Sequence, residues 1–147
     1  MEANDKTMVM VQTIIHAPIE KVWNSWTTTD NIVEWNFASD DWQCPTAEND
    51  LRSGGIFKYR MEAKDGSFGF DFSGVYDLVN DNELIEYTLD DGRKVKVDFT
   101  AMIDKTEIIE TFEAENINSI KIQHDGWQSI LDNFKKLVEH NTKKTVV

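Results

Sequence analysis

Between residues 54 and 113, apolar and polar residues alternate along one segment after another, with a turn signal after each segment. This period of two is typical of strands that bury one face. Phe57, Tyr59 and Met61 show it first, and the turn pair Asp65-Gly66 ends their segment. Consecutive strands joined by short turns predict an antiparallel meander, and no other feature restricts the fold as strongly.

The same pattern predicts the remaining strands. Alternation runs through residues 85–89 up to Asp91-Gly92, a favoured type I′ pair, and resumes over residues 95–103. A last strand over residues 106–113 and a first over residues 8–15 bring the total to six or seven. In the segment after residue 66, the side chains expected on one face are Phe68, Phe70, Phe72, Tyr76 and Leu78.

Helical spacing appears near both ends of the chain. Pro18 suits the first turn of a helix that continues to Thr27, and residues 30–35 indicate a further helical turn. Within residues 124–140, Asp125 can cap a helix, because Gln128 follows at the spacing of a capping box. The apolar stripe of this closing helix consists of Trp127, Ile130, Leu131, Phe134, Leu137 and Val138.

The stripe of the closing helix must lie against an apolar surface, and the aromatic face of the meander is the one of matching size. We therefore predict an α+β fold of the helix-grip type, in which a curved antiparallel sheet wraps around a long C-terminal helix. No linker or repeat interrupts the sequence, so residues 1–147 are expected to form a single domain.

The net charge of −12 over 147 residues disfavours nucleic acids and anionic membranes as partners. No apolar run approaches the roughly 18 residues that a membrane-spanning helix needs. The acidic, polar start of the chain differs from the basic start of a secretory signal. These features predict a cytoplasmic protein that neither inserts into a membrane nor binds nucleic acid.

The residues that usually hold metals or act as nucleophiles show no motif. Cys44 is the only cysteine, and His16, His124 and His140 lack the spacing of metal ligands. We therefore expect no metal, no other cofactor and no catalytic residue.

The aromatic face and the helix stripe could either line a ligand cavity or fill a solid core. Facing aromatic rings leave gaps more readily than branched aliphatic side chains, and tyrosine hydroxyls can orient a polar group. An enclosed space of some 300 Å³ or more would favour a ligand. The candidate cavity residues are Trp35, Phe57, Tyr59, Phe70, Phe72, Tyr76, Phe99, Glu110, Phe112, Trp127, Leu131 and Phe134.

Glu110 has two possible orientations. If the last strand runs without a bulge, Glu110 shares a face with Ile108 and Phe112 and points inward, where it needs a partner or a raised pKa. If Ile109 and Thr111 point inward instead, Glu110 lies in water, which is the more usual position for a carboxylate.

Six motifs in this order resemble the START-like (SRPBCC) superfamily, and within it the bacterial family similar to the C-terminal domain of the activator of heat-shock protein 90 ATPase. They are "HAPIEKVWNSWT", "DLRSGGIF", "GFDFSGVYD", "DGRKVKVDF", "ETFEAEN" and "GWQSILDNFKKLVE", and together they extend over nearly the whole chain.

The resemblance implies a cavity between the sheet and the last helix that holds a lipid, sterol, polyketide or flavonoid-like molecule. We expect non-catalytic binding of a small, mostly apolar or amphipathic ligand. A protein partner, as for the chaperone-activating relatives, is one alternative. A cyclase-like or hydrolase-like enzyme that uses the same cavity is another, and Glu110 or a tyrosine would be its acid or base.

Overall fold

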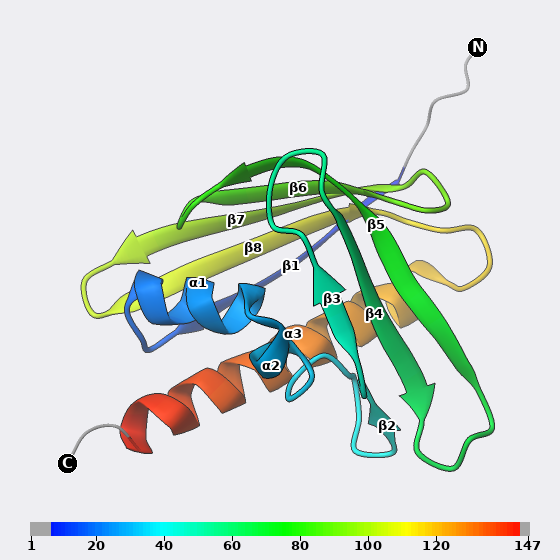
Figure 1. Cartoon of the computed structure of the whole chain (residues 1–147), viewed down its shortest axis with the longest axis horizontal. Coiled ribbons are helices and arrows are strands. Elements are labelled where there is room, and N and C mark those ends of the chain that lie inside the picture. The colour runs from blue at the N-terminus through cyan, green and yellow to red at the C-terminus, as the bar shows by residue number, and fades with distance from the viewer. Residues whose placement is uncertain (1–6, 145–147) are drawn as a thin grey trace.

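An eight-stranded antiparallel sheet forms most of the computed structural model, which describes residues 7–144 (Figure 1). The sheet curves around the helices, and the long last helix lies across its concave side. The elements follow each other as β1 (Met8–Ile15), α1 (Ile19–Thr27), α2 (Thr29–Ile32), β2 (Trp42–Gln43), β3 (Ala47–Asn49), β4 (Ile56–Ala63), β5 (Gly69–Asn80), β6 (Leu84–Leu89), β7 (Lys94–Met102), β8 (Lys105–Glu113) and α3 (Ile120–Lys144). This architecture confirms the predicted helix-grip fold.

The sheet is a meander closed by its first strand. Its order is β1-β8-β7-β6-β5-β4-β2, and β3 also pairs with β4. Strands β4 to β8 are neighbours in sequence and in space, whereas β1 pairs with β8 across most of the chain. The two strands that the sequence did not resolve, β2 and β3, are two and three residues long, too short to show a period.

The core lies between the concave face and the helices. Alternate residues of β1, β7 and β8 point toward α3, whose Leu131, Phe134 and Val138 are at most 1% exposed. Full burial of such a side chain stabilises the fold by roughly 1.5–3 kcal/mol. The predicted apolar stripe of the closing helix is therefore confirmed.

The last helix begins at Ile120, five residues before the predicted cap. Ser119 caps it, because its Oγ accepts a hydrogen bond from the backbone N–H of Ile122 at 3.1 Å. Asp125 lies inside the helix and pairs with Lys121 at 2.6 Å. The prediction of a start at Asp125 was wrong because the spacing that suggests a capping box also occurs inside helices.

Strand β5 contains an irregularity that changes which of its residues face inward. The pairing register with β6 shifts between Tyr76 and Leu78, so Val79 and not Leu78 packs against the core. Phe68 precedes the strand and is 62% exposed. The prediction of a single apolar face from Phe68 to Leu78 therefore holds only for its middle part, because an extra residue inverts the alternation.

Two details of the following hairpins also differ from what the sequence predicts. Only Gly92 of the Asp91-Gly92 pair has a positive φ, +94°, and its N–H bonds to the carbonyl of Leu89 at 2.8 Å. This is a three-residue loop with glycine in the left-handed region, and a type I′ turn would need two such residues. At the far end of β7, Ile103 does not continue the strand: it lies in the turn after Met102 and is 88% exposed.

Candidate functional site

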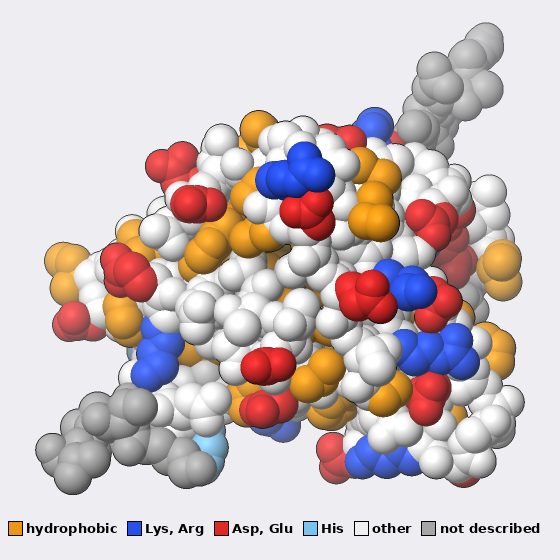
Figure 2. All heavy atoms as spheres, viewed as in Figure 1, with side chains coloured by type: hydrophobic (Ala, Val, Ile, Leu, Met, Phe, Trp, Pro, Cys, Tyr) orange, Lys and Arg blue, Asp and Glu red, His pale blue; other side chains and the backbone are white. Residues whose placement is uncertain are grey.

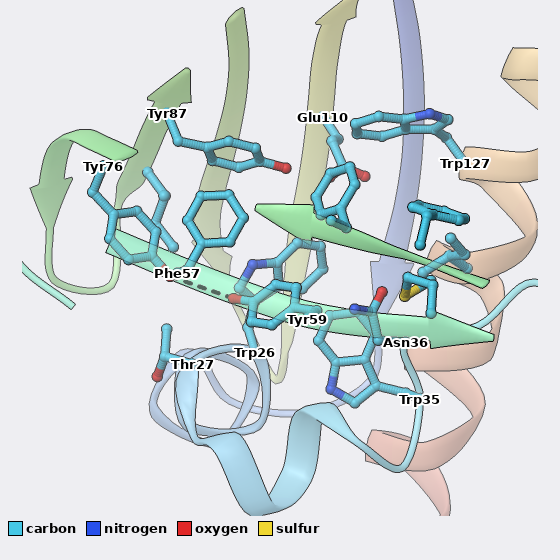
Figure 3. A pocket seen from close by; sticks show the side chains of 15 residues that line it. Trp26, Thr27, Trp35, Asn36, Phe57, Tyr59, Tyr76, Tyr87, Glu110 and Trp127 are labelled. Carbon is cyan, nitrogen blue, oxygen red and sulfur yellow. Dashed lines mark hydrogen bonds between the residues drawn. The ribbon is translucent and has the colours of Figure 1, made fainter. Parts of the chain in front are cut away.

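A pocket of about 160 Å³ lies between the concave face of the sheet and the helices (Figure 3). Strands β4, β5, β6 and β8 form one side of it, and α1, the segment after α2, and α3 form the other. Aromatic rings make up most of the wall. The lining residues are Trp26, Thr27, Trp35, Asn36, Phe57, Tyr59, Met61, Phe70, Phe72, Tyr76, Ile85, Tyr87, Glu110, Trp127 and Ile130.

The structure places eight of the twelve candidate residues along this wall. Strand alternation brings them together, because every second residue of β4 and β5 points to the concave side. That they bind a ligand stays a prediction. The eight residues are Trp35, Phe57, Tyr59, Phe70, Phe72, Tyr76, Glu110 and Trp127.

The other four candidates do not line the pocket; they lie in the packed core beside it. Phe112 stacks on Trp127 with ring centroids 3.9 Å apart, and thus supports the wall from behind. The ring of Phe134 lies 4.9 Å from that of Trp26 and is fully buried. Phe99 and Leu131 are also enclosed, at 5% and 1% exposure. The sequence pattern therefore did not distinguish residues of the pocket wall from residues of the packed core.

Seven lining residues were not predicted as cavity residues. Two of them follow patterns that the sequence shows: Met61 continues the alternation of Tyr59, and Ile130 belongs to the helix stripe. Asn36 carried no signal, because a turn after α2 places it. The full set of missed residues is Trp26, Thr27, Asn36, Met61, Ile85, Tyr87 and Ile130.

Glu110 points into the pocket, between Tyr87 and Trp127 (Figure 3). It is 6% exposed, and its neighbours on the same face, Ile108 and Phe112, are fully buried. The more usual, solvated orientation is therefore wrong for this residue. Burial raises the pKa of Glu110 to about 8, because the charged form loses its hydration.

The carboxyl group of Glu110 has no hydrogen-bond or ion-pair partner among residues 7–144. No lysine, arginine or histidine lines the pocket. Buried polar groups are nearly always hydrogen-bonded, so this carboxyl group is a specific exception. It provides an unused bonding position inside an otherwise aromatic space.

Three tyrosines add hydroxyl groups to the wall. The hydroxyl oxygens of Tyr59 and Tyr76 lie 3.3 Å apart (Figure 3). The side-chain amide of Asn49 donates to the hydroxyl of Tyr76 at 3.5 Å. Burial raises the pKa of Tyr59 and of Tyr87 well above the usual value, with a further contribution from Glu110 at Tyr87. These hydroxyls therefore stay protonated and can donate hydrogen bonds.

The profile of the family described as Activator of Hsp90 ATPase homolog 1-like protein matches residues 16–139. The chain belongs to the AHSA1-like family. The predicted resemblance, including the START-like superfamily that contains this family, is thereby confirmed.

Solved structures place this AHSA1-like chain beside other bacterial proteins. An AHSA1-like protein from Aeromonas hydrophila is 41% identical with a TM-score of 0.87, over 92% of this chain and 94% of that one. A protein from Cytophaga hutchinsonii is 48% identical with a TM-score of 0.76, over 94% of each chain. No curated protein matches the chain significantly.

The AHSA1-like fold supports a ligand-binding or activator-like module.

Within residues 7–144, no group of three or more His, Cys, Asp or Glu side chains could hold a metal ion. Burial raises the pKa of the Cys44 thiol to about 11, with an opposing hydrogen bond from Asn36, so this thiol is protonated at neutral pH. No helix in the described part of the chain is long and apolar enough to cross a bilayer.

On the face shown in Figure 2, acidic side chains are spread among fewer basic ones. The net charge of −12 disfavours the approach of anionic molecules to the protein as a whole, and anionic ligands are therefore disfavoured.

Proposed function

We propose that the chain binds a small, mostly apolar molecule with one polar group in the pocket between the sheet and α3, and releases it unchanged. One observation carries this proposal: a partly enclosed aromatic space contains a buried carboxyl group without a partner. Ligand sites are typically apolar clefts with a few convergent polar groups, and this pocket has that composition.

The volume of the pocket limits the size of the ligand. About 160 Å³ is well below the roughly 300 Å³ that was expected to favour a ligand, so the pocket does not meet that expectation. It is close to the roughly 150 Å³ of an engineered apolar cavity that binds benzene. The ligand is therefore a single-ring molecule or one of similar bulk, and sterols or flavonoid-like molecules would require the wall to move.

The wall is held in place by contacts outside the pocket, which supports a preformed site. The indole N–H of Trp35 donates to the carbonyl of Ser25 at 3.0 Å, and the amide of Asn133 on α3 donates to the carbonyl of Trp35 at 2.9 Å. Asn49 donates to the carbonyl of Thr27 at 2.9 Å. These bonds join α1, α3 and β3 around the pocket and reduce the ordering cost of binding.

The test is a titration of the ¹⁵N-labelled protein with single-ring probes, benzyl alcohol and indole, and with cholesterol as a large probe. The chain has five tryptophans, of which Trp26, Trp35 and Trp127 line the pocket while Trp23 and Trp42 do not. We expect saturable shifts of the first three indole N–H signals and smaller shifts of the other two. Native mass spectrometry of the purified protein should find any retained molecule chemically unchanged.

A variant that fills the pocket provides the control. Ile130→Phe adds a ring to the wall and should weaken benzyl alcohol binding at least tenfold. Leu137→Phe makes the same kind of change on α3, at a position that does not line the pocket, and should retain binding. Absence of saturable shifts with every single-ring probe, or equal shifts in the Ile130→Phe variant, would refute the proposed site.

A further inference from the structure

We propose that the polar group of this ligand is a protonated amine, held by the carboxylate of Glu110 within a surround of aromatic rings. The inference rests on the proposed binding function and adds the chemical class of the ligand. Its first support is geometric: Glu110 is 6% exposed, and its carboxyl group points into the pocket and has no partner among the described residues.

The described residues that face Glu110 carry no positive charge. In the sheet it lies between Val11 of β1 and Val97 of β7, neither of which can ionise. The remaining ionisable groups of the wall are Tyr59, Tyr76 and Tyr87, which are neutral when protonated. Arg93 acts on Tyr87 through its charge but does not line the pocket. A buried carboxylate is stable when it is paired with a cation, and the pocket itself supplies none.

The aromatic walls suit the same kind of ligand. The face of an aromatic ring carries negative potential and attracts an ammonium group, most strongly when the ring belongs to tryptophan. Trp26 and Trp35 approach the pocket from the side opposite Glu110, and Trp127 borders it beside the carboxyl group (Figure 3). An ammonium ion between these rings would be attracted by the rings and by the carboxylate together.

A neutral ligand would use the pocket differently. With a pKa of about 8, Glu110 is mostly protonated at pH 7 and could donate one hydrogen bond to an alcohol or carbonyl oxygen. An amine instead requires the ionised form, of which about one molecule in ten is present at pH 7. The two ligand classes therefore depend on pH in opposite directions, and this difference separates them experimentally.

The experiment compares benzylamine with benzyl alcohol, two probes of the same shape that differ in the charged group. Calorimetric titrations at pH 6, 7 and 8 cover a range in which an alkylamine is protonated. Benzylamine affinity should rise about ninefold from pH 6 to pH 7 and about fivefold from pH 7 to pH 8, because the ionised fraction of Glu110 increases by these factors when its pKa is about 8. Benzyl alcohol affinity should stay level and fall about twofold at pH 8.

Two matched variants assign the effect to the proposed carboxylate. Glu110→Gln keeps the shape and removes the charge, so at pH 8 it should lose at least tenfold in benzylamine affinity while benzyl alcohol binding changes less than about threefold. Glu107→Gln makes the same substitution on the outer side of β8, away from the pocket, and should bind both probes like the wild type. Circular dichroism of each variant verifies folding.

The outcomes separate the two proposals. Tighter binding of benzyl alcohol than of benzylamine at pH 8, a level pH profile for benzylamine, or an unchanged benzylamine affinity in Glu110→Gln would overturn the amine assignment and leave the pocket as a site for neutral molecules. Absence of binding for both probes would overturn the amine assignment and the proposed binding function together.

Discussion

Replacing Glu110 with glutamine should remove a loss of stability that the wild-type protein undergoes as the pH rises from 5 to 8. Burial raises the pKa of Glu110 from 4.5 to about 8, so in this range the folded protein keeps a proton that the unfolded chain releases. The stability gained from this proton is complete below pH 4.5 and is lost as the pH approaches 8. At 1.36 kcal/mol per pKa unit, the wild type should lose roughly 3 kcal/mol relative to Glu110→Gln between pH 5 and pH 8.

The assay is urea unfolding followed by tryptophan fluorescence at pH 5, 6, 7 and 8, on the wild type, Glu110→Gln and Glu107→Gln. Comparison with Glu107→Gln corrects for the loss of one negative charge in a protein of net charge −12. We expect the wild type and Glu110→Gln to be similar near pH 5 and to diverge steadily above it. If the difference between them stays constant from pH 5 to pH 8, Glu110 is not a buried acid with a raised pKa, and the account of the pocket given above fails.

Further predictions concern the fold. Phe134→Ala should lower the free energy of unfolding by roughly 3–5 kcal/mol, because Phe134 is 0% exposed and does not line the pocket. A much smaller loss in urea unfolding would mean that the pocket extends to this residue. Gly74→Ala should destabilise the protein by about 1–3 kcal/mol, because a Cβ at this position would lie 2.3 Å from the carbonyl oxygen of Thr88. Gly126→Ala in α3 should instead stabilise the protein by up to about 1 kcal/mol, because a Cβ there meets nothing within 4 Å and alanine favours the helix. Calorimetry should show one unfolding transition for the chain, as expected of a single domain; two resolved transitions would contradict that expectation.

Much of the fold could be predicted because strong periodicity and turn residues agreed over long segments. The strand at residues 8–15 and the helix ending at Thr27 were placed correctly, since β-branched alternation gives way to helical spacing after Pro18. Errors arose where one extra residue or a loop detail decided the outcome. The shift after Tyr76 inverts the faces of β5, and nothing in the sequence of that strand marks it.

The pocket was harder to predict, because its wall combines side chains from strands and helices that lie far apart in the sequence. The orientation of Glu110 illustrates this: residues on both faces of β8 are at least half-buried, so alternation in that strand alone gives no direction. Pairing with β1 and β7 decides it, since Val11 and Val97 are themselves buried on the concave face. Such pairing is set by the whole sheet, and a single strand does not encode it.

The last helix seals a solid core along one part of its length and covers the pocket along another. Phe134 and Val138 pack against buried side chains without a gap, whereas Trp127 and Ile130, toward the start of the helix, face the open space. The difference follows from the aromatic side chains opposite, because large flat rings on β4 and β5 do not interdigitate as closely as the branched side chains of β1 and β7. The side chains of the helix that border the pocket, such as Ile130, can accordingly change at a smaller cost in stability than Phe134 and Val138.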